Sequence, residues 1–206
     1  MRLGRKPPFS WFSDAAKTLL ALQHYVQAYS VTQRTNLEKR DYLGWWQKAT
    51  GCRLFVETGT YAGLTTAYMA NLCDHCYTVE LDPALHRQAQ ERLADRKNIT
   101  LYLGDSAQWL PAILERISEP ALFWLDAHSS GGATARGTED TPFARELDMI
   151  LAHPIKNHVL LIDDARCYCG VFSYPSIRRL QKLVEQKSSY AMHINNDIIV
   201  IHPWEY

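Results

Sequence analysis

From residue 53 onward, the sequence alternates between short apolar runs and longer amphipathic stretches. Five of the runs have the length of buried strands: 53–57, 76–80, 99–103, 121–126 and 158–163. Continuous apolar runs of this length are typical of strands that are covered on both faces. Alternation of strands with helices predicts a parallel sheet with helices on both faces. This pattern restricts the chain to an α/β fold.

The C-terminal part predicts an antiparallel hairpin. Apolar runs at 190–194 and 197–201 are joined by Asn195-Asn196, a dipeptide suited to a tight turn. Further upstream, Asp82-Pro83 and Thr141-Pro142 each pair a capping residue with a proline that fits the first helical turn. We therefore expect a seven-stranded, mostly parallel sheet that ends in this hairpin.

Residues 1–50 precede the alternation and predict an N-terminal helical extension. Apolar residues recur at helical spacing within 13–35, at Leu19, Leu22, Val26 and Tyr29. A second short helix is expected at 40–50, which contains Trp45 and Trp46. We expect residues 1–50 to form a lid or a homodimer contact, and residues 51–206 to form a single domain.

Composition excludes several classes of protein. Lys plus Arg equals Asp plus Glu, at 22 each, whereas general nucleic-acid binders carry a basic excess. No apolar run reaches the roughly 18 residues of a membrane span, and the basic segment 1–11 lacks the apolar stretch of a secretory signal. Cys73 and Cys76 are predicted at the opposite edge of the sheet from Cys167 and Cys169, which favours reduced thiols over one zinc site. We expect a cytoplasmic protein without nucleic-acid partners.

The loop after the first predicted strand contains two glycines. It reads Glu57-Thr58-Gly59-Thr60-Tyr61-Ala62-Gly63, and a helix is expected directly after it. Glycine allows a sharp turn and the close approach of a ligand to the backbone. The spacing acid-x-Gly-x-x-x-Gly differs from the G-x-G-x-x-G of dinucleotide-dependent oxidoreductases, so it disfavours that class.

Acidic and polar side chains follow the next two strands. Glu80 ends the second strand 21 residues after Gly59, a separation at which an acid accepts hydrogen bonds from ribose hydroxyls. Asp105 and Ser106 follow the third strand, where polar groups reach an adenine amino group. The alternative is that Asp105 and Ser106 only cap the next helix and that Glu80 faces solvent. Three such positions at successive strand ends favour a nucleoside site.

Three more carboxylates follow the fourth and fifth strands, at Asp126, Asp163 and Asp164. Like charges repel, and a divalent cation such as Mg²⁺ would relieve the repulsion and lower the pKa of a substrate hydroxyl. The ordinary pKa of a histidine side chain would suit His128 to act as a general base at neutral pH. For the Asp pair, the alternatives are helix capping or a salt bridge to Arg166, Arg145 or Arg136. For His128, they are a loop histidine that is bonded to local backbone, or a side chain that only orients Asp126.

The sequence resembles the class I S-adenosylmethionine (SAM)-dependent methyltransferases from about Leu54 to Ile201. The motifs are FVETGTYAG, VELDP, LGDSAQWLP and LFWLDAH. The resemblance implies a Rossmann-like fold with SAM as cofactor. It implies that Glu80 holds the ribose, that Asp105 and Ser106 flank the adenine, and that the methionine part lies near Glu57, Gly59, Thr60 and Gly63.

The acidic residues are similar to those of metal-dependent O-methyltransferases that act on macrolide sugars and aminocoumarins, and to those of catechol O-methyltransferases. This resemblance implies that Asp126, Asp163 and Asp164 bind Mg²⁺ or another divalent cation, and that a hydroxyl of a small molecule or sugar is methylated. His128 stands where the sugar-modifying enzymes have an Asp, so Asp126 and His128 are the candidate catalytic residues. Metal-independent O- or N-methylation and a catalytically silent binding module remain alternatives.

Overall fold

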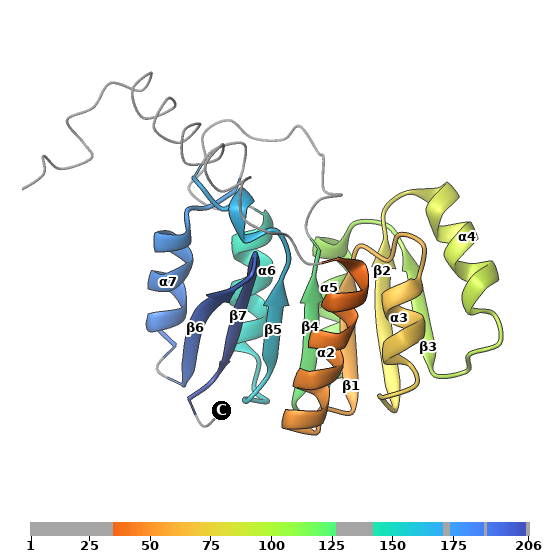
Figure 1. Cartoon of the computed structure of the whole chain (residues 1–206), viewed down its shortest axis with the longest axis horizontal. Coiled ribbons are helices and arrows are strands. Elements are labelled where there is room, and N and C mark those ends of the chain that lie inside the picture. The colour runs from red at the N-terminus through yellow and green to blue at the C-terminus, as the bar shows by residue number, and fades with distance from the viewer. Residues whose placement is uncertain (1–34, 127–141, 171–173, 188, 205–206) are drawn as a thin grey trace, which may run out of the picture.

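The computed structural model describes residues 35–126, 142–170, 174–187 and 189–204. Its strands are β1 (Leu54–Thr58), β2 (His75–Glu80), β3 (Ile99–Leu103), β4 (Ala121–Leu125), β5 (Val159–Ile162), β6 (Tyr190–Asn195) and β7 (Ile198–Pro203). They form one seven-stranded sheet in the order β3-β2-β1-β4-β5-β7-β6 (Figure 1). Neighbours among β1 to β5 are parallel, and β7 is antiparallel to both β5 and β6. The predicted α/β sheet with a C-terminal antiparallel hairpin is confirmed.

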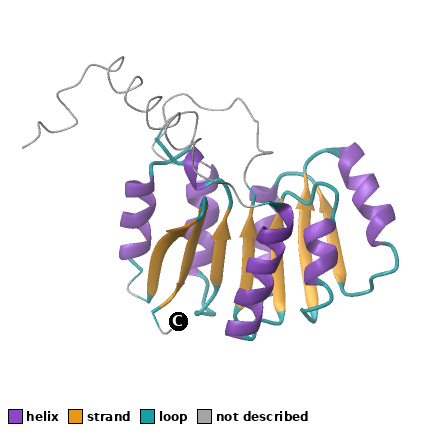
Figure 2. Cartoon of the chain, in the orientation of Figure 1, coloured by secondary structure: helices purple, strands orange, loops and turns teal. Residues whose placement is uncertain are grey.

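Helices cover both faces of the sheet, as predicted. α2 (Asn36–Thr50) and α3 (Leu64–Met69) lie in front of the sheet in the view of Figures 1 and 2, with α4 (Pro83–Leu93) beside β2 and β3. The opposite face carries α5 (Ser106–Leu114), α6 (Pro142–Ala152) and α7 (Ile177–Glu185). A short 3₁₀ helix, η3 (Ala165–Cys167), follows β5.

Each face of the sheet has its own hydrophobic cluster. Val56 belongs to the cluster beneath α5, α6 and α7, whereas its neighbour Phe55 belongs to the cluster beneath α2 and α3. Successive strand residues point to opposite faces, so a strand covered on both faces is apolar at most positions. This explains why the strands appear in the sequence as continuous apolar runs.

The described part of the predicted N-terminal extension forms a layer of the fold. α2 begins at Asn36, four residues earlier than expected, with Thr35 and Glu38 in a reciprocal capping box. Leu43 and Trp46 of α2 are buried against the sheet. The predicted helix within 13–35 lies outside the described residues. Within the described part of the chain, no helix is long and apolar enough to cross a membrane.

Of the helix start and the hairpin turn that the sequence predicts, the structure confirms the first and shifts the second. The Asp82 side chain accepts hydrogen bonds from the N–H groups of Ala84 and Leu85, and Pro83 opens α4 as predicted. The predicted position of the hairpin turn is wrong by one residue, because β6 continues to Asn195, which pairs with Ile198. The turn residues are Asn196 and Asp197, with φ of 44° and 67°, and two left-handed residues match the twist of a tight hairpin.

Candidate active site

The carboxyl ends of four parallel strands meet at one edge of the sheet. Thr58 of β1 pairs with Val79 of β2 and with Leu125 of β4, and Leu125 pairs with Ile162 of β5. The order of the strands reverses between β1 and β4, and ligands of open α/β sheets bind at such a switch point. This edge, which we call the carboxyl edge, therefore holds the residues that follow these strands.

The loop after β1 has a fixed backbone conformation. Gly59 and Gly63 have φ of 90° and 72°, which is left-handed and costs glycine little. The N–H groups of Gly59 and Thr60 both donate to the Val79 carbonyl, at 2.9 and 3.2 Å. A Cβ at Gly63 would lie 3.3 Å from the Leu93 side chain of α4. Gly63 thus serves both the turn and the packing of α4 beside the loop.

Glu57 lies beneath this loop rather than on its surface. Its side chain is 1% exposed and accepts hydrogen bonds from the hydroxyls of Thr66 and Thr78, the latter at 2.8 Å. Thr60 is buried as well, with its hydroxyl 2.6 Å from that of Thr78. Burial raises the pKa of Glu57 to about 8, because a charged carboxylate is poorly solvated there. Glu57 is therefore placed to support the loop.

Glu80 joins the loop to the start of α4. One carboxylate oxygen accepts from the Tyr61 N–H at 2.7 Å and the other from the Asp82 N–H at 2.9 Å. The side chain is 2% exposed, so the alternative of a solvent-facing Glu80 is wrong. Each carboxylate oxygen can accept a second hydrogen bond, which leaves Glu80 able to bind a pair of hydroxyls.

Asp105 and Ser106 have separate partners after β3. Asp105 caps α5 by accepting from the Ala107 N–H at 2.9 Å, as in the capping alternative. The Ser106 hydroxyl donates to Glu146 of α6 at 2.9 Å. Glu146 is buried, and burial raises its pKa to about 7. Glu146 could not be predicted from the sequence, since it lies 40 positions from Ser106 within an ordinary helical pattern.

Asp163 and Asp164 are each paired with a cation from the chain. The Lys39 ammonium of α2 lies 2.5 Å from Asp163, and the Arg166 guanidinium lies 2.5 Å from Asp164. Arg166 also binds Asp197 in the hairpin turn. From the sequence, the salt bridge between Asp164 and Arg166 was expected as an alternative to metal binding. Lys39 was not among the predicted site residues, because it precedes the first strand and belongs to no motif.

Asp126 lies beside this pair at the end of β4. Its N–H donates to the Thr58 carbonyl at 3.1 Å, which places Asp126 next to the loop after β1. Burial raises the pKa of Asp163 to about 6, and Lys39 opposes that rise whereas Asp164 and Asp126 add to it. The three carboxylates are thus near enough to influence one another. His128 lies outside the described residues.

Both members of the Asp163–Asp164 pair, which are candidate metal ligands, have a cationic partner from the chain. Among the residues that the structure describes, no three His, Cys, Asp or Glu side chains are arranged to hold a metal ion. Lys39 and Arg166 contact the carboxylates that a metal would bind. Two positive charges of the chain therefore lie beside the carboxylates that are candidate ligands of Mg²⁺.

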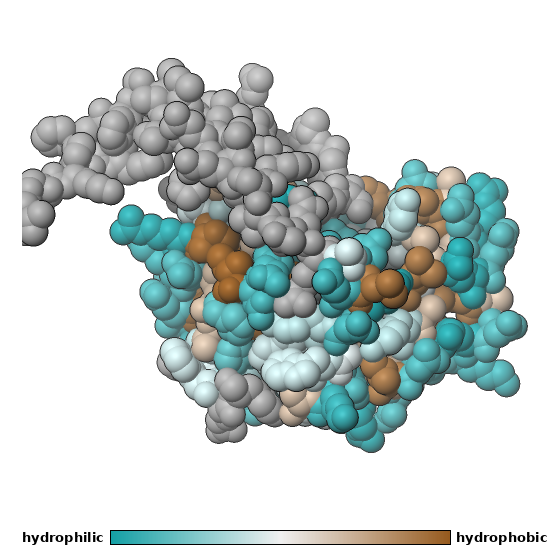
Figure 3. Space-filling model, in the orientation of Figure 1, coloured by the Kyte–Doolittle hydropathy of each residue, from teal (hydrophilic) through white to brown (hydrophobic). Residues whose placement is uncertain are grey.

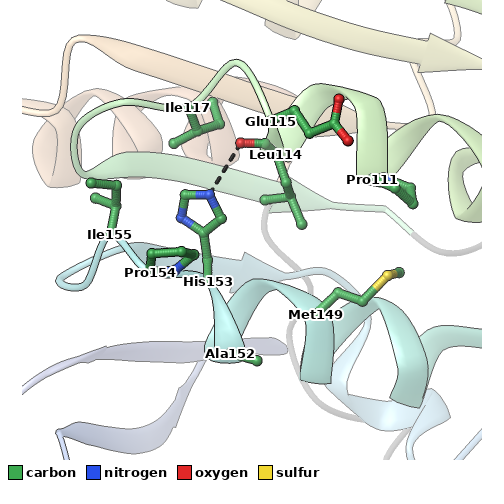
Figure 4. A pocket seen from close by; sticks show the side chains of 9 residues that line it. All are labelled: Pro111, Leu114, Glu115, Ile117, Met149, Ala152, His153, Pro154 and Ile155. Atoms are coloured by element: carbon green, nitrogen blue, oxygen red, sulfur yellow. Dashed lines mark hydrogen bonds between the residues drawn. The ribbon is translucent and has the colours of Figure 1, made fainter.

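A pocket lies at the edge of the sheet opposite the carboxyl edge. This open pocket has a volume of about 670 Å³ and lies where α5 and α6 end (Figure 4). Its lining includes Pro111, Leu114, Met149, Ala152, His153 and Ile155. Because cofactors of open α/β sheets bind at the carboxyl ends of the strands, this pocket is not the predicted cofactor site.

The fold is shared with solved methyltransferase structures. One is the O-methyltransferase TomG from Streptomyces achromogenes, in complex with SAM, at 14% identity and a TM-score of 0.61 over 93% of this chain and 90% of that one. Another is the O-methyltransferase from Bacillus cereus, in complex with S-adenosylhomocysteine (SAH), at 14% identity and a TM-score of 0.60 over 93% and 91% of the two chains. This chain has the class I methyltransferase fold.

The class I methyltransferase fold leaves the acceptor undecided. The 23S rRNA methyltransferase ErmE also matches, at 16% identity and a TM-score of 0.52 over 83% of this chain and 69% of that one. Neither a protein-family model nor a curated protein sequence matches this chain. The acceptor must therefore be argued from the residues of the carboxyl edge.

Proposed function

We propose that the protein is a SAM-dependent methyltransferase that acts on a hydroxyl group of a small-molecule or sugar acceptor. The observation that carries the proposal is the carboxyl edge, where the glycine loop after β1 is joined to Glu80 at the switch point of a class I methyltransferase fold. When bound, SAM supplies an electrophilic methyl group on a positively charged sulfur. The acceptor oxygen gains this methyl group, and the carbon–sulfur bond breaks to leave SAH.

The proposed cofactor residues divide into those that touch the ligand and those that support it. Glu80 has acceptor capacity left for ribose hydroxyls, and the backbone of Gly59 and Gly63 allows a close approach to the methionine part. Asp105 and Ser106 flank the adenine. Glu57 and Thr60 act from beneath the loop through Thr66 and Thr78.

Proton transfer is assigned to the residues that follow β4. The acceptor hydroxyl must lose its proton as its oxygen gains the methyl group, and a positioned base accelerates such a step. Asp126 lies beside the switch point, and His128 is two residues further along the chain. We assign the base to His128, with Asp126 orienting it. An amine acceptor would use the same pair.

Two forms of the proposal differ in the cation that faces the acceptor. In the first, Asp126, Asp163 and Asp164 bind Mg²⁺ or another divalent cation, which is supported by three carboxylates at neighbouring strand ends. In the second, the positive charge belongs to the chain, which is favoured by the 2.5 Å contact between Lys39 and Asp163. Turnover that survives exhaustive chelation would support the second form, and turnover that needs added Mg²⁺ would support the first.

Calorimetric titration with SAH tests the function directly. We expect binding by the chelator-treated protein, and a loss of about tenfold or more in affinity for Glu80→Gln, because hydrogen bonds to a charged group contribute about 1.5–3 kcal/mol. Glutamine keeps an acceptor oxygen for the Tyr61 N–H. Glu91→Gln, at an exposed position of α4, is the matched control.

Either of two results would contradict this proposal. Absence of SAH binding by the wild-type protein would favour a catalytically silent module. Equal SAH affinities of the wild type and Glu80→Gln would show that Glu80 does not bind the ribose.

The remaining expectations concern partners and location. The proposed acceptor is a small molecule, and the proposed location is the cytoplasm, which agrees with five free cysteines. A homodimer contact through the N-terminal helices stays a prediction. On the face that carries α2, hydrophobic residues form separate patches (Figure 3), although Leu37 and Trp45 of α2 are exposed.

A further inference from the structure

Lys39 brings a positive charge to the carboxyl edge from outside the strand–helix alternation. It lies in the first turns of α2, whose Leu43 and Trp46 are buried against the sheet and fix the position of the helix. The Lys39 ammonium lies 2.5 Å from Asp163, a side chain that is 4% exposed. An ammonium at the closest face of a buried carboxylate excludes another cation from that face.

The Lys39 ammonium has capacity beyond this ion pair. An ammonium has three N–H donors, and within the described residues Asp163 accepts the one hydrogen bond that Lys39 donates. The Lys39 side chain is 19% exposed, so it remains accessible at the edge where an acceptor must lie. Two donors are therefore available to an oxygen atom of a ligand.

The charges near the Asp pair are balanced by the chain. Lys39 and Arg166 together carry two positive charges, the same as one Mg²⁺, and each contacts one member of the pair. Arg166 is additionally held by Asp197 in the hairpin turn and its side chain is 10% exposed, whereas the Lys39 side chain is 19% exposed. A hard divalent cation would have to displace Lys39 to reach Asp163.

We propose that the Lys39 ammonium takes the place of a divalent cation and donates a hydrogen bond to the oxygen atom of the methyl acceptor. This inference rests on the proposed function. Lys39 stays protonated throughout: the hydroxyl proton goes to the base, the oxygen–carbon bond forms and the carbon–sulfur bond breaks. The ammonium stabilises the negative charge that develops on the acceptor oxygen before the new bond is complete.

Manganese binding tests the inference without any acceptor. Electron paramagnetic resonance of Mn²⁺ mixed with chelator-treated protein should show no stoichiometric site in the wild type. Lys39→Met keeps an unbranched stem and removes the charge, so about one Mn²⁺ should bind at the vacated Asp163 carboxylate. Lys48→Met, in the exposed last turn of α2, is the matched control and should bind none.

Two results would overturn the inference. One is a stoichiometric Mn²⁺ site in the wild type that Asp163→Asn abolishes, which would establish the metal-dependent form. The other is a Lys39→Met protein that binds no more Mn²⁺ than the wild type. If Lys39→Met does not fold, Lys39→Gln replaces it, since glutamine is neutral and still donates to Asp163.

SAH titration separates this inference from the proposed function. Lys39→Met should bind SAH as the wild type does, because Lys39 faces the acceptor rather than the cofactor loop. A wild type that binds no SAH would overturn the proposed function. SAH binding by both proteins, combined with no Mn²⁺ site in Lys39→Met, would overturn the role of Lys39 alone.

Discussion

Three individual residues near the carboxyl edge have buried carboxyl groups. Glu57, Glu146 and Asp163 are all buried, and burial raises the pKa of each. Hydroxyl donors from Thr66, Thr78 and Ser106 or the Lys39 ammonium oppose the rise. Because a buried acid that stays protonated in the fold loses its proton on unfolding, these residues couple stability to pH.

Glu57→Gln should flatten the fall in stability between pH 4.5 and about pH 8. The folded pKa of Glu57 is about 8 and its ordinary value is 4.5, so between these values the folded state holds a proton that the unfolded state lacks. The free energy of unfolding therefore falls as the pH rises through this window. Glutamine does not titrate, and it still accepts from Thr66 and Thr78.

Urea unfolding between about pH 5 and pH 8 measures this effect. Glu91→Gln on the exposed side of α4 should retain the wild-type slope. Equal slopes for Glu57→Gln and the wild type would show that Glu57 is ionised in the fold.

A chain of imidazoles connects secondary-structure elements away from the carboxyl edge. The Ala121 N–H donates to His158 Nδ1 at 3.1 Å, so the proton of neutral His158 is on Nε2. His158 Nε2 donates to His153 Nδ1 at 3.1 Å. His153 Nε2 in turn donates to the Leu114 carbonyl at 3.1 Å (Figure 4). The two rings thus join the ends of α5 and α6 to the starts of β4 and β5.

His158→Asn should make the protein less sensitive to mild acid. Burial lowers the pKa of His158 from 6.5 to about 4, so between these values the unfolded state binds a proton that the folded state does not. The free energy of unfolding therefore falls as the pH drops through this window. Asparagine does not titrate there, and its side-chain oxygen still accepts from the Ala121 N–H.

Chemical unfolding tests this prediction, through the difference between the free energies of unfolding at about pH 7 and about pH 5. His86→Asn on α4 is the control, because His86 lies outside the imidazole chain. An acid sensitivity of His158→Asn equal to that of the wild type would refute the buried neutral imidazole.

No covalent crosslink stabilises the whole molecule. All five cysteines are free, and four of them are buried: Cys52, Cys73, Cys76 and Cys167. Cys73 and Cys76 lie around the start of β2, whereas Cys167 lies in η3, which follows the carboxyl end of β5. The predicted separation of the two cysteine pairs is confirmed, and stability rests on the packing of both faces.

A reductant should leave the midpoint of thermal unfolding unchanged. Reduction removes stability only where it opens a disulfide that restricts the unfolded chain. Calorimetric scans with and without dithiothreitol should agree within about 1 °C, since about 1 kcal/mol would shift the midpoint of a chain of this size by about 2–4 °C. A midpoint several degrees lower in reductant would reveal a disulfide between cysteines that the structure shows as free.

The sequence by itself determined the sheet and the residues at its carboxyl edge. The central strands β1, β2, β4 and β5 are buried on both faces, so their positions are recognisable in the sequence as apolar runs. The residue after each of these strands must lie at the carboxyl edge. Glu80 and Asp126 were placed in this way. Gly63 was placed as well, because a left-handed turn beside a packed helix favours glycine.

Only the tertiary structure decided which charges meet at that edge. Lys39 and Asp163 are 124 positions apart, Ser106 and Glu146 are 40 apart, and Arg166 and Asp197 are 31 apart. Such pairs depend on how α2, α6 and the hairpin pack on the sheet, and no local spacing encodes that packing. The acidic residues alone therefore predicted a metal ion, whereas the folded chain places its own lysine and arginine beside them.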